Sequence, residues 1–520
     1  MSTCDQRIEF GRSKRLSRYV AIVAPALLLL AGTAWADESF SLSSEYYFPT
    51  KNVEGGSTFP LTSFDISFVD SSAGVYLLAD RNNQSADLLD LNFNTLSVIS
   101  PGNPQEGNNT GTGYNPKNNC TLVVNGRSGC FAGLVNDPNA GPINDISGPN
   151  GIILVNHREI WAGDAPTLSG AIPLSTSCQS GTLSACKTAY LSVDNCDSSI
   201  KVIDIRTQNV TDVIDTGGCF RADELAYDPR DKVVLIANPS EQDIGNFNFI
   251  TLISTKPGHA ILKKIVFDGA RGTPLATAGI EQPAYDPETG LFYVAVPNNG
   301  GTFASPGGNG AVAVVDPRGD HPGLVRVFNL ASSCVPNGAA IGPNHELLLG
   351  CNSTAPVQII DTRDGRLIQA VSQLKGGCDE VWFNPGDDHF MGACSMGRNV
   401  SPTSGGTSPF YVAGVIDALS RSGPHWDQNI TIKDTFTTTL GGNTVRTGSP
   451  HSIAADAYTN RILVPLAAGD LSAASCPTGC IAAFTAPDDD SSEAVQEAEL
   501  GIGHGRDDHH DRDSGFFGSH

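Results

Sequence analysis

One short sequence pattern occurs six times along this chain, and it restricts the fold more than any other feature. Each copy joins two short apolar runs through a turn rich in Asp, Asn, Pro and Gly, which is the pattern of a β-hairpin. The clearest copies are ELAYDPRDKVVLIAN at 224–238, QPAYDPETGLFYVAV at 282–296 and EVWFNPGDDHFMGAC at 380–394, and looser copies occupy 65–80, 338–351 and 452–466.

Further strand-like runs lie between the copies, such as IKVIDIRT at 200–207 and VQIIDTRDG at 357–365. Turn residues at fixed offsets within a repeat of roughly 40–60 residues are typical of a β-propeller blade. The sequence therefore predicts an all-β, seven-bladed β-propeller, with six or eight blades as alternatives. The seventh blade lacks an outer strand, and the segment SFSLSSEYYFP at 39–49 is expected to supply it and close the ring.

Three segments follow one another along the chain. Residues 1–36 have a basic start, an apolar stretch from Tyr19 to Gly32 and a small-residue cleavage site at 34–36, which predicts a signal peptide and a secreted or periplasmic protein. An uncleaved anchor is the alternative. Residues 37–487 form the propeller domain, with no further run of ~20 apolar residues to span a membrane. Residues 488–520 form an acidic, His-rich tail that we expect to be disordered.

Twelve cysteines follow the leader, and this even number in an exported chain predicts a disulfide framework. Two pairs are placed symmetrically about hairpin turns, so their members face each other across antiparallel strands. These expected disulfides are Cys334–Cys351 and Cys378–Cys394, to which we add Cys196–Cys219 and the local pairs Cys120–Cys130, Cys178–Cys186 and Cys476–Cys480.

Three long insertions interrupt the repeat, at 101–148, 163–188 and 395–410. Loops of this length inside a compact fold are usually functional or disordered. We expect the two insertions that contain cysteines to form ordered caps over one mouth of the ring.

The starts of the inner strands face the central channel of a propeller, so the repeat alignment predicts the channel residues. The last two positions before each apolar strand are Phe64-Asp65, Asp223-Glu224, Glu281-Gln282, Asn337-Gly338, Asp379-Glu380 and His451-Ser452. The alignment leaves out the irregular second blade, in whose turn His157 and Arg158 lie. Several carboxylates are thus expected near one axis.

Converging carboxylates repel one another unless a cation, a proton or a basic side chain compensates their charge. Carboxylate and amide oxygens suit Ca²⁺ or Mg²⁺. The candidate ligands are Glu224, Asp379, Glu281 and Asn337, and Ca²⁺ is the preferred ion. A bound cation polarises an ester or lactone carbonyl.

The candidate catalytic residues are His451, as a general base on water, and Glu224. The other channel candidates are Asp65, Asp223, Glu380, Gln282 and Arg221. Arg221 lies beside Asp223 in the sequence and is placed to neutralise the cluster without a metal. An inert channel, in which these groups cap strands and bind water, is a further alternative.

Several partners are excluded by composition and motif. A net charge of −23 opposes binding to nucleic acid. The chain has no Cys-x-x-Cys-His haem attachment motif and no Gly-rich loop before a helix, so we expect neither haem nor a nucleotide. The sequence does not indicate an oligomeric state.

The repeated hairpin resembles that of the YVTN-type and lactonase-like seven-bladed propellers. AYDPRDKVVLIAN, AYDPETGLFYVAV, FNPGDDHFMGAC and SPHSIAADAYTNRILVP carry the resemblance, which covers roughly 64–486. The calcium-dependent lactonases of that superfamily use a hub of acidic and amide ligands, and the resemblance implies a similar role for Glu224, Asn337, Asp379 and Glu281.

The leading expectation is a metal-assisted hydrolase that acts on a small lactone or ester in the channel. The first alternative is a non-catalytic exported propeller that binds a protein or glycan partner. The second is a periplasmic redox protein with a metal or quinone in the hub.

Overall fold

The fold is that of a β-propeller, and the part of the chain described below is almost entirely strands and turns. The computed structural model describes residues 41–47, 61–94, 96–100, 122–137, 141–166, 196–330, 334–352, 355–375, 377–394, 412–417, 432–435, 439–440, 443–444, 451–466 and 479–485. All of them belong to the unit Glu38–His520. The predicted signal peptide and the acidic tail lie outside the described residues.

Seven four-stranded antiparallel sheets make up the described part of the ring, in agreement with the leading expectation of seven blades. The first three, from the inner strand outwards, are β2 (Ser67–Asp70), β3 (Val75–Asp80), β4 (Ser85–Asp90) and β5 (Leu96–Ile99); β10 (Ile152–Val155), β11 (Glu159–Asp164), β12 (Ser199–Asp204) and β13 (Asn209–Asp215); and β14 (Leu225–Asp228), β15 (Val233–Asn238), β16 (Phe249–Ser254) and β17 (Ile261–Val266).

The next three sheets repeat this order along the chain. They are β18 (Pro283–Asp286), β19 (Leu291–Val296), β22 (Ala311–Asp316) and β23 (Gly323–Asn329); β24 (Pro336–Ile341), β25 (Glu346–Cys351), β26 (Pro356–Asp361) and β27 (Leu367–Lys375); and β28 (Cys378–Asn384), β29 (His389–Cys394), β30 (Val412–Asp417) and β31 (Ile432–Thr435).

The seventh sheet joins the two ends of the propeller. It consists of β34 (Ala454–Asp456), β35 (Arg461–Leu466), β36 (Cys480–Thr485) and β1 (Ser41–Tyr47). Strand β1 pairs antiparallel with β36, with Ser41 opposite Thr485 and Tyr47 opposite Cys480. The predicted closure by the N-terminal segment is therefore confirmed, and it covers the outer edge of β36.

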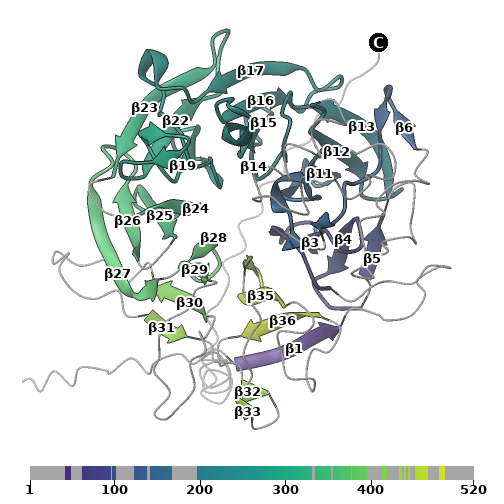
Figure 1. Cartoon of the computed structure of the whole chain (residues 1–520). Helices are drawn as coiled ribbons and strands as arrows, with labels where there is room; N and C mark the ends of the chain where they lie inside the picture. The colour runs from purple at the N-terminus through teal and green to yellow at the C-terminus, as the bar shows by residue number, and fades with distance from the viewer. Residues whose placement is uncertain are drawn as a thin grey trace, which may run out of the picture. The chain divides into compact units, whose positions relative to one another are not determined.

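The inner strands β2, β10, β14, β18, β24, β28 and β34 are neighbours in this order, and β34 returns to β2. Figure 1 shows the sheets arranged in a ring. Short two-stranded ladders lie outside the sheets. These are β6 (Val123–Val124) with β7 (Arg127–Ser128), β8 (Asn136–Asp137) with β9 (Gly141–Pro142), β20 (Gly301–Thr302) with β21 (Ser305–Pro306), and β32 (Thr439–Leu440) with β33 (Asn443–Thr444).

Three short 3-10 turns, at Asn144–Ile146, Glu241–Ile244 and Ala270–Gly272, are the helical elements of the described residues. None of the helices described is long and apolar enough to cross a membrane.

The repeated Asp at the end of the inner strand explains the hairpin turn. The Asp228 carboxylate accepts hydrogen bonds from the Arg230 and Asp231 amides at 2.9 and 3.1 Å. The Asp286 carboxylate accepts the Glu288 amide at 2.9 Å, and Asp456 does the same for the Tyr458 amide at 3.2 Å. Such side-chain contacts replace backbone partners in a tight turn, which is why Asp and Asn are favoured here.

The core consists of apolar layers between neighbouring blades. Alternate residues of β15 serve two layers: Val233 and Leu235 pack towards the fourth blade, whereas Val234 and Ile236 pack towards the second. Successive side chains of a strand point to opposite faces, so a strand buried on both sides reads as an unbroken apolar run. The VVLIA run of the sequence is the result.

Three predicted disulfides are confirmed, namely Cys196–Cys219, Cys334–Cys351 and Cys378–Cys394. Cys378 lies directly opposite Cys394 across the β28–β29 pair, as the symmetric spacing predicted. Cys130 and Cys480 are also disulfide-bonded. Their proposed partners Cys120 and Cys476, and the pair Cys178–Cys186, lie outside the described residues.

Two details of the predicted alignment were wrong or incomplete. The amides of Asp65, Asp223 and Glu281 donate to the equivalent carbonyls of Ala79, Ala237 and Ala295. The first blade therefore contributes Asp65-Ile66 to the two channel positions, and the predicted pair Phe64-Asp65 is one residue early.

The second blade does align with the others, because the backbone amide of Asn150 donates a hydrogen bond to the Gly163 carbonyl in the same way. Its channel pair is Asn150-Gly151. Glycine is required there, since a Cβ on Gly151 would lie 2.2 Å from the Asp223 carbonyl oxygen of the next blade.

Candidate functional site

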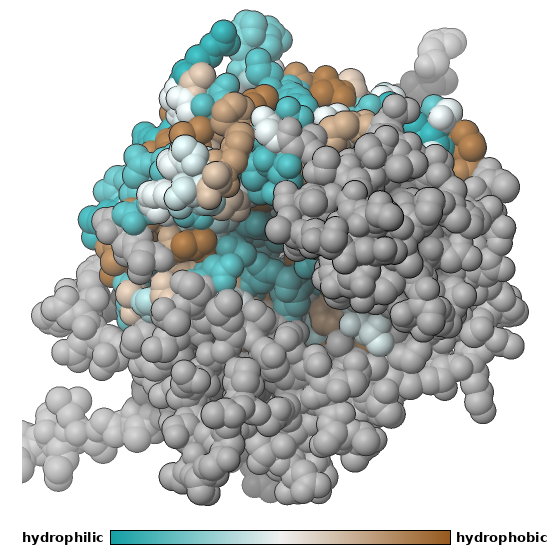
Figure 2. All heavy atoms as spheres, viewed as in Figure 1, coloured by the Kyte–Doolittle hydropathy of each residue, from teal (hydrophilic) through white to brown (hydrophobic). Residues whose placement is uncertain are grey.

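Two rings of equivalent positions surround the propeller axis where the inner strands begin. The first ring consists of Asp65, Asn150, Asp223, Glu281, Asn337, Asp379 and His451. The second ring, one residue further along each strand, consists of Ile66, Gly151, Glu224, Gln282, Gly338, Glu380 and Ser452. The channel residues predicted from six blades are thus brought together, and Asn150-Gly151 of the second blade completes the rings. In Figure 2, the residues visible inside the hollow of this face are mostly hydrophilic.

Ion pairs connect much of the first ring. Arg81, at the end of β3, places Nη2 at 2.5 Å from Asp65 Oδ2 and donates to Asn150 Oδ1 at 2.7 Å. Arg221 places Nη2 at 3.0 Å from Asp223 Oδ2. We refer to the first ring together with Arg81 and Arg221 as the charged layer.

His451 bridges two carboxylates of the charged layer. Its Nε2 lies 2.7 Å from Asp65 Oδ1, and its Nδ1 lies 3.0 Å from Asp379 Oδ2. Asn337 donates to the other oxygen of Asp379 at 2.8 Å. Burial lowers the pKa of His451, but the Asp379 charge and hydrogen bonds to both carboxylates outweigh it and raise the pKa well above 6.5. The imidazole is held as a cation.

The two carboxyl groups that contact His451 have lowered pKa values. Although burial opposes ionisation, Arg81 and His451 hold the pKa of Asp65 well below its usual range. His451 lowers the pKa of Asp379 in the same way, also against the effect of burial. An imidazolium with both nitrogens engaged has no free lone pair, so in this arrangement His451 does not accept a proton from water.

The remaining carboxyls of the two rings have raised pKa values. Burial raises the pKa of Asp223 to about 7, with Arg221 opposing the shift. Burial and the charges of Asp223 and Glu281 raise the pKa of Glu224 well above its usual range. Burial also raises the pKa of Glu281 well above its usual range. The charge of Asp223 adds to this shift, and Arg221 opposes it. The acidic cluster is therefore compensated by protons and by three cations of the chain itself.

No group of three or more His, Cys, Asp or Glu side chains in the described residues is arranged to hold a metal ion. Asp379 is engaged by His451 and Asn337, and these two contacts occupy one carboxylate oxygen each. The predicted ligands Glu224, Glu281, Asn337 and Asp379 share the channel without forming such a group.

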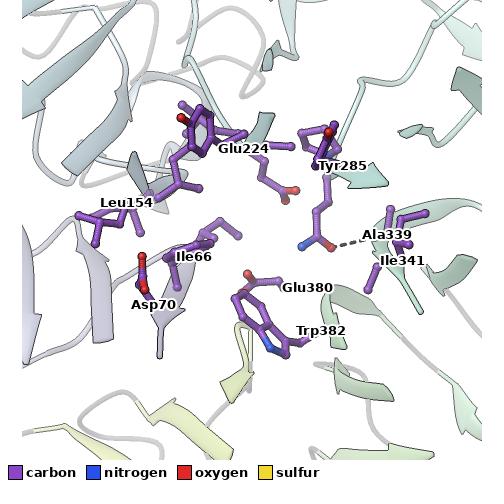
Figure 3. Close-up of a pocket in the computed structure, with 18 of the residues that line it drawn as sticks. Ile66, Asp70, Leu154, Glu224, Tyr285, Ala339, Ile341, Glu380 and Trp382 are labelled. Atoms are coloured by element: carbon purple, nitrogen blue, oxygen red, sulfur yellow. Dashed lines mark hydrogen bonds between the residues drawn. The ribbon is translucent and has the colours of Figure 1, made fainter. Parts of the chain in front are cut away.

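A cavity of about 690 Å³ extends from the second ring along the inner strands to their turns (Figure 3). We call it the central pocket. Six of the seven inner strands contribute to its walls, which are mainly apolar and aromatic: Ile66, Phe68, Leu154, Tyr227, Tyr285, Ile341, Trp382 and Phe383 are members. Trp382 of the sixth blade contacts Phe68 of the first edge to face, with ring centroids 5.6 Å apart. Turn residues Asp70, Asn156 and His157 line its outer end.

Three polar side chains of the second ring line the inner end of the central pocket. The Gln282 amide is fixed, because its oxygen accepts the Ala339 amide at 2.8 Å and its nitrogen donates to the Val381 carbonyl at 3.3 Å. Glu380 accepts a hydrogen bond from the Ser452 hydroxyl and one from the Ile453 amide at 3.3 Å.

Glu224 differs from these two neighbours. It is 4% exposed, and its Oε2 is buried without a hydrogen-bond partner among the described residues. Figure 3 shows its carboxyl directed towards the middle of the pocket, as is that of Glu380. Burial raises the pKa of Glu380 well above its usual range as well, despite the Ser452 contact.

Sequence reasoning found both rings but missed several functional groups. Arg81 and Asn150 were not predicted, although the GPNG segment before the IILV run at 152–155 resembles the SPHS segment before IAAD. The aromatic residues that line the pocket were not predicted. Phe68 and Trp382 lie two residues beyond the second ring, and Tyr227, Tyr285 and Phe383 lie three residues beyond it, which is a signal that the repeat alignment contains.

Comparisons with known proteins add the fold alone. No family model matches the chain, and no curated protein matches it. Among solved structures, 1063 chains match, so the fold is shared too widely to indicate a function. One is described as "Crystal Structure of Mitotic Checkpoint Complex", with a TM-score of 0.48 and 8% identity over 91% of this chain and 99% of that one.

Proposed function

We propose that this chain is an exported β-propeller that binds a small, largely apolar molecule in the central pocket. The supporting observation is an apolar and aromatic cavity of about 690 Å³ with a few fixed polar groups at its inner end. Small-molecule sites typically have volumes of about 300–1,000 Å³ and this division between apolar walls and convergent polar groups. Three disulfides in the propeller agree with an oxidising compartment.

The wall of the pocket suits this role because it is preformed. Gln282 and Glu380 are held by hydrogen bonds before any ligand arrives, the latter through Ser452 beside the pocket. A site that is already ordered loses little conformational entropy on binding.

Binding is tested with N-phenyl-1-naphthylamine, an uncharged apolar fluorophore whose emission rises in an apolar site. We expect saturable binding to the wild-type protein and at least tenfold weaker binding to Ile341→Asn, because a polar group then interrupts the apolar wall. The matched control is Ile261→Asn, on the outer strand β17, where the side chain is 48% exposed. Absence of saturable binding, or equal binding by Ile341→Asn, contradicts the proposal.

Metal-assisted hydrolysis of a lactone or ester is the second candidate. One observation favours it: beside burial, the charge of Asp223 raises the pKa values of Glu224 and Glu281, and a divalent cation would relieve that repulsion. The resemblance to lactonase-like propellers points the same way. The ion pairs of Asp65 and Asp379, and the cationic state of His451, favour the binding role instead.

Elemental analysis separates these two candidates. The protein is purified without a metal-affinity tag, and wild type is compared with the variant Glu224→Ala/Asp379→Ala. About one equivalent of calcium in the wild type and none in the variant supports the hydrolase. No metal in the wild type, or equal metal in both, rejects this metal site and leaves ligand binding as the function.

A further inference from the structure

The central pocket contains a buried carboxyl that has no counter-ion among the described residues. Oε2 of Glu224 has no hydrogen-bond partner among the described residues, and the side chain is directed into the cavity (Figure 3). Leaving a buried polar atom unsatisfied destabilises a fold. A buried carboxyl that is directed into a cavity therefore points to a partner bound in that cavity.

The described residues that line the pocket include Asp70, Glu224 and Glu380 but no Lys or Arg. The nearby arginines are engaged elsewhere, since Arg81 pairs with Asp65 and Arg221 with Asp223 in the charged layer. At the outer end of the pocket, His157 contacts Asp70 at 2.6 Å. At the inner end, no basic side chain among the described lining residues offsets Glu224 and Glu380. A ligand carboxylate or phosphate would find no basic partner at this end, whereas a ligand cation would meet carboxyls that can ionise to pair with it.

The aromatic side chains of the wall favour the same charge. Tyr227, Tyr285 and Trp382 line the pocket, and a cation over an aromatic ring is attracted by the ring quadrupole. This attraction is strongest where water is excluded and where the cation carries apolar substituents. An alkylated ammonium group satisfies both conditions.

On the basis of the proposed function, we propose that the central pocket selects an apolar amine, whose ammonium group pairs with the Glu224 carboxylate between aromatic walls. In the complex an opposite charge at contact distance stabilises the ionised form of Glu224. Gln282 and Glu380 stay in their present hydrogen bonds and shape the inner end of the site. The apolar part of the amine occupies the wall formed by residues such as Leu154 and Ile341.

Two probes of equal shape test the charge directly: phenyltrimethylammonium and its uncharged isostere tert-butylbenzene. Each is titrated as a competitor of bound N-phenyl-1-naphthylamine. For the wild type we expect the cation to displace the fluorophore at a concentration at least tenfold lower than the isostere does. A preference of this kind cannot come from shape or apolar area, which the two probes share.

The role of Glu224 is tested with Glu224→Gln, which keeps the shape and removes the charge. We expect the ratio of the displacing concentrations of the two probes to fall to about one, while the fluorophore still binds. Glu288→Gln, at a turn residue whose side chain is 64% exposed, is the matched control and should keep the wild-type preference. If Glu224→Gln fails to fold, the wild-type comparison of the two probes still decides the ligand class.

The outcomes separate the two proposals. Equal or stronger displacement by tert-butylbenzene overturns the selection of amines but leaves small-molecule binding intact. A preference that persists in Glu224→Gln overturns the assignment of the counter-ion. Failure of the fluorophore itself to bind the wild type overturns both.

Discussion

His451 shows how one side chain can connect three blades. It belongs to the seventh blade, and its two nitrogens reach Asp65 of the first and Asp379 of the sixth. These contacts cross both boundaries of the blade that closes the ring. The strong elevation of its pKa means that the bridge is present at neutral pH.

We predict a pH-dependent stability contribution from this bridge. A histidine whose folded pKa is raised contributes stability that is fully present below about pH 6.5 and is lost as pH rises through the raised value. His451→Gln should therefore lower the free energy of unfolding by about 1–3 kcal/mol at pH 6 and by less at pH 10. Urea unfolding at the two pH values measures the difference.

The control for this measurement is His321→Gln, at an exposed position in the turn between β22 and β23. Its effect should stay within about 0.5 kcal/mol at both pH values. A loss for His451→Gln that is equal at pH 6 and pH 10 would show that the imidazole acts by packing alone.

At the scale of single elements, each blade is built on the same inner hairpin, but only the fifth and sixth hairpins carry a described disulfide across the pair. Cys334–Cys351 links the chain just before β24 to the end of β25, and both cysteines are fully buried. The bond therefore closes the hairpin at the end that is opposite to its turn. It restricts the unfolded chain over a sequence separation of 17 residues.

We predict that Cys334→Ala/Cys351→Ala lowers the free energy of unfolding by about 2–4 kcal/mol, mainly because the unfolded chain gains freedom. Unfolding in urea under non-reducing conditions measures it. The single variant Cys334→Ala should lower the free energy of unfolding by at least as much, because it also leaves the buried thiol of Cys351 unpaired. An unchanged midpoint in the double variant would mean that the hairpin is equally constrained by its strand pairing and packing.

At the scale of the whole molecule, ring closure depends on one strand that is distant in sequence. The pairing of β1 with β36 completes the seventh sheet, and without it β36 would present an unpaired edge. An exposed edge strand is a template for pairing with other chains.

Deletion of Ser41–Tyr47 should therefore lower the midpoint of thermal unfolding and promote self-association. Light scattering and calorimetry measure the two effects. Addition of a synthetic peptide with the sequence SLSSEYY should restore part of the stability by strand addition, whereas a scrambled peptide should not. A deletion variant that stays monomeric with an unchanged midpoint would contradict the role assigned to β1.

Much of this architecture was encoded locally. The hairpins follow from short, unbroken apolar runs and from Asp or Asn side chains that bond to the turn backbone, so a repeated pattern of about 15 residues predicts them. The disulfides Cys334–Cys351 and Cys378–Cys394 follow from symmetry about a turn. The closing role of the N-terminal segment follows from the missing fourth strand of the last blade. The single error of register, at Phe64, arose because only pairing with β3 places Asp65 at the ring position.

The chemistry of the channel was decided by tertiary structure. The sequence by itself placed Asp65, Glu224, Asp379 and His451 near one axis, but it did not reveal which of them pair. Arg81 reaches Asp65 from the far end of β3, and His451 joins carboxylates that are 386 and 72 residues away in sequence. Protonation depends on such distances and on burial, because Coulomb energy and desolvation vary with position rather than with residue type. For the same reason the central pocket and its unpaired Glu224 exist only once six inner strands meet around the axis.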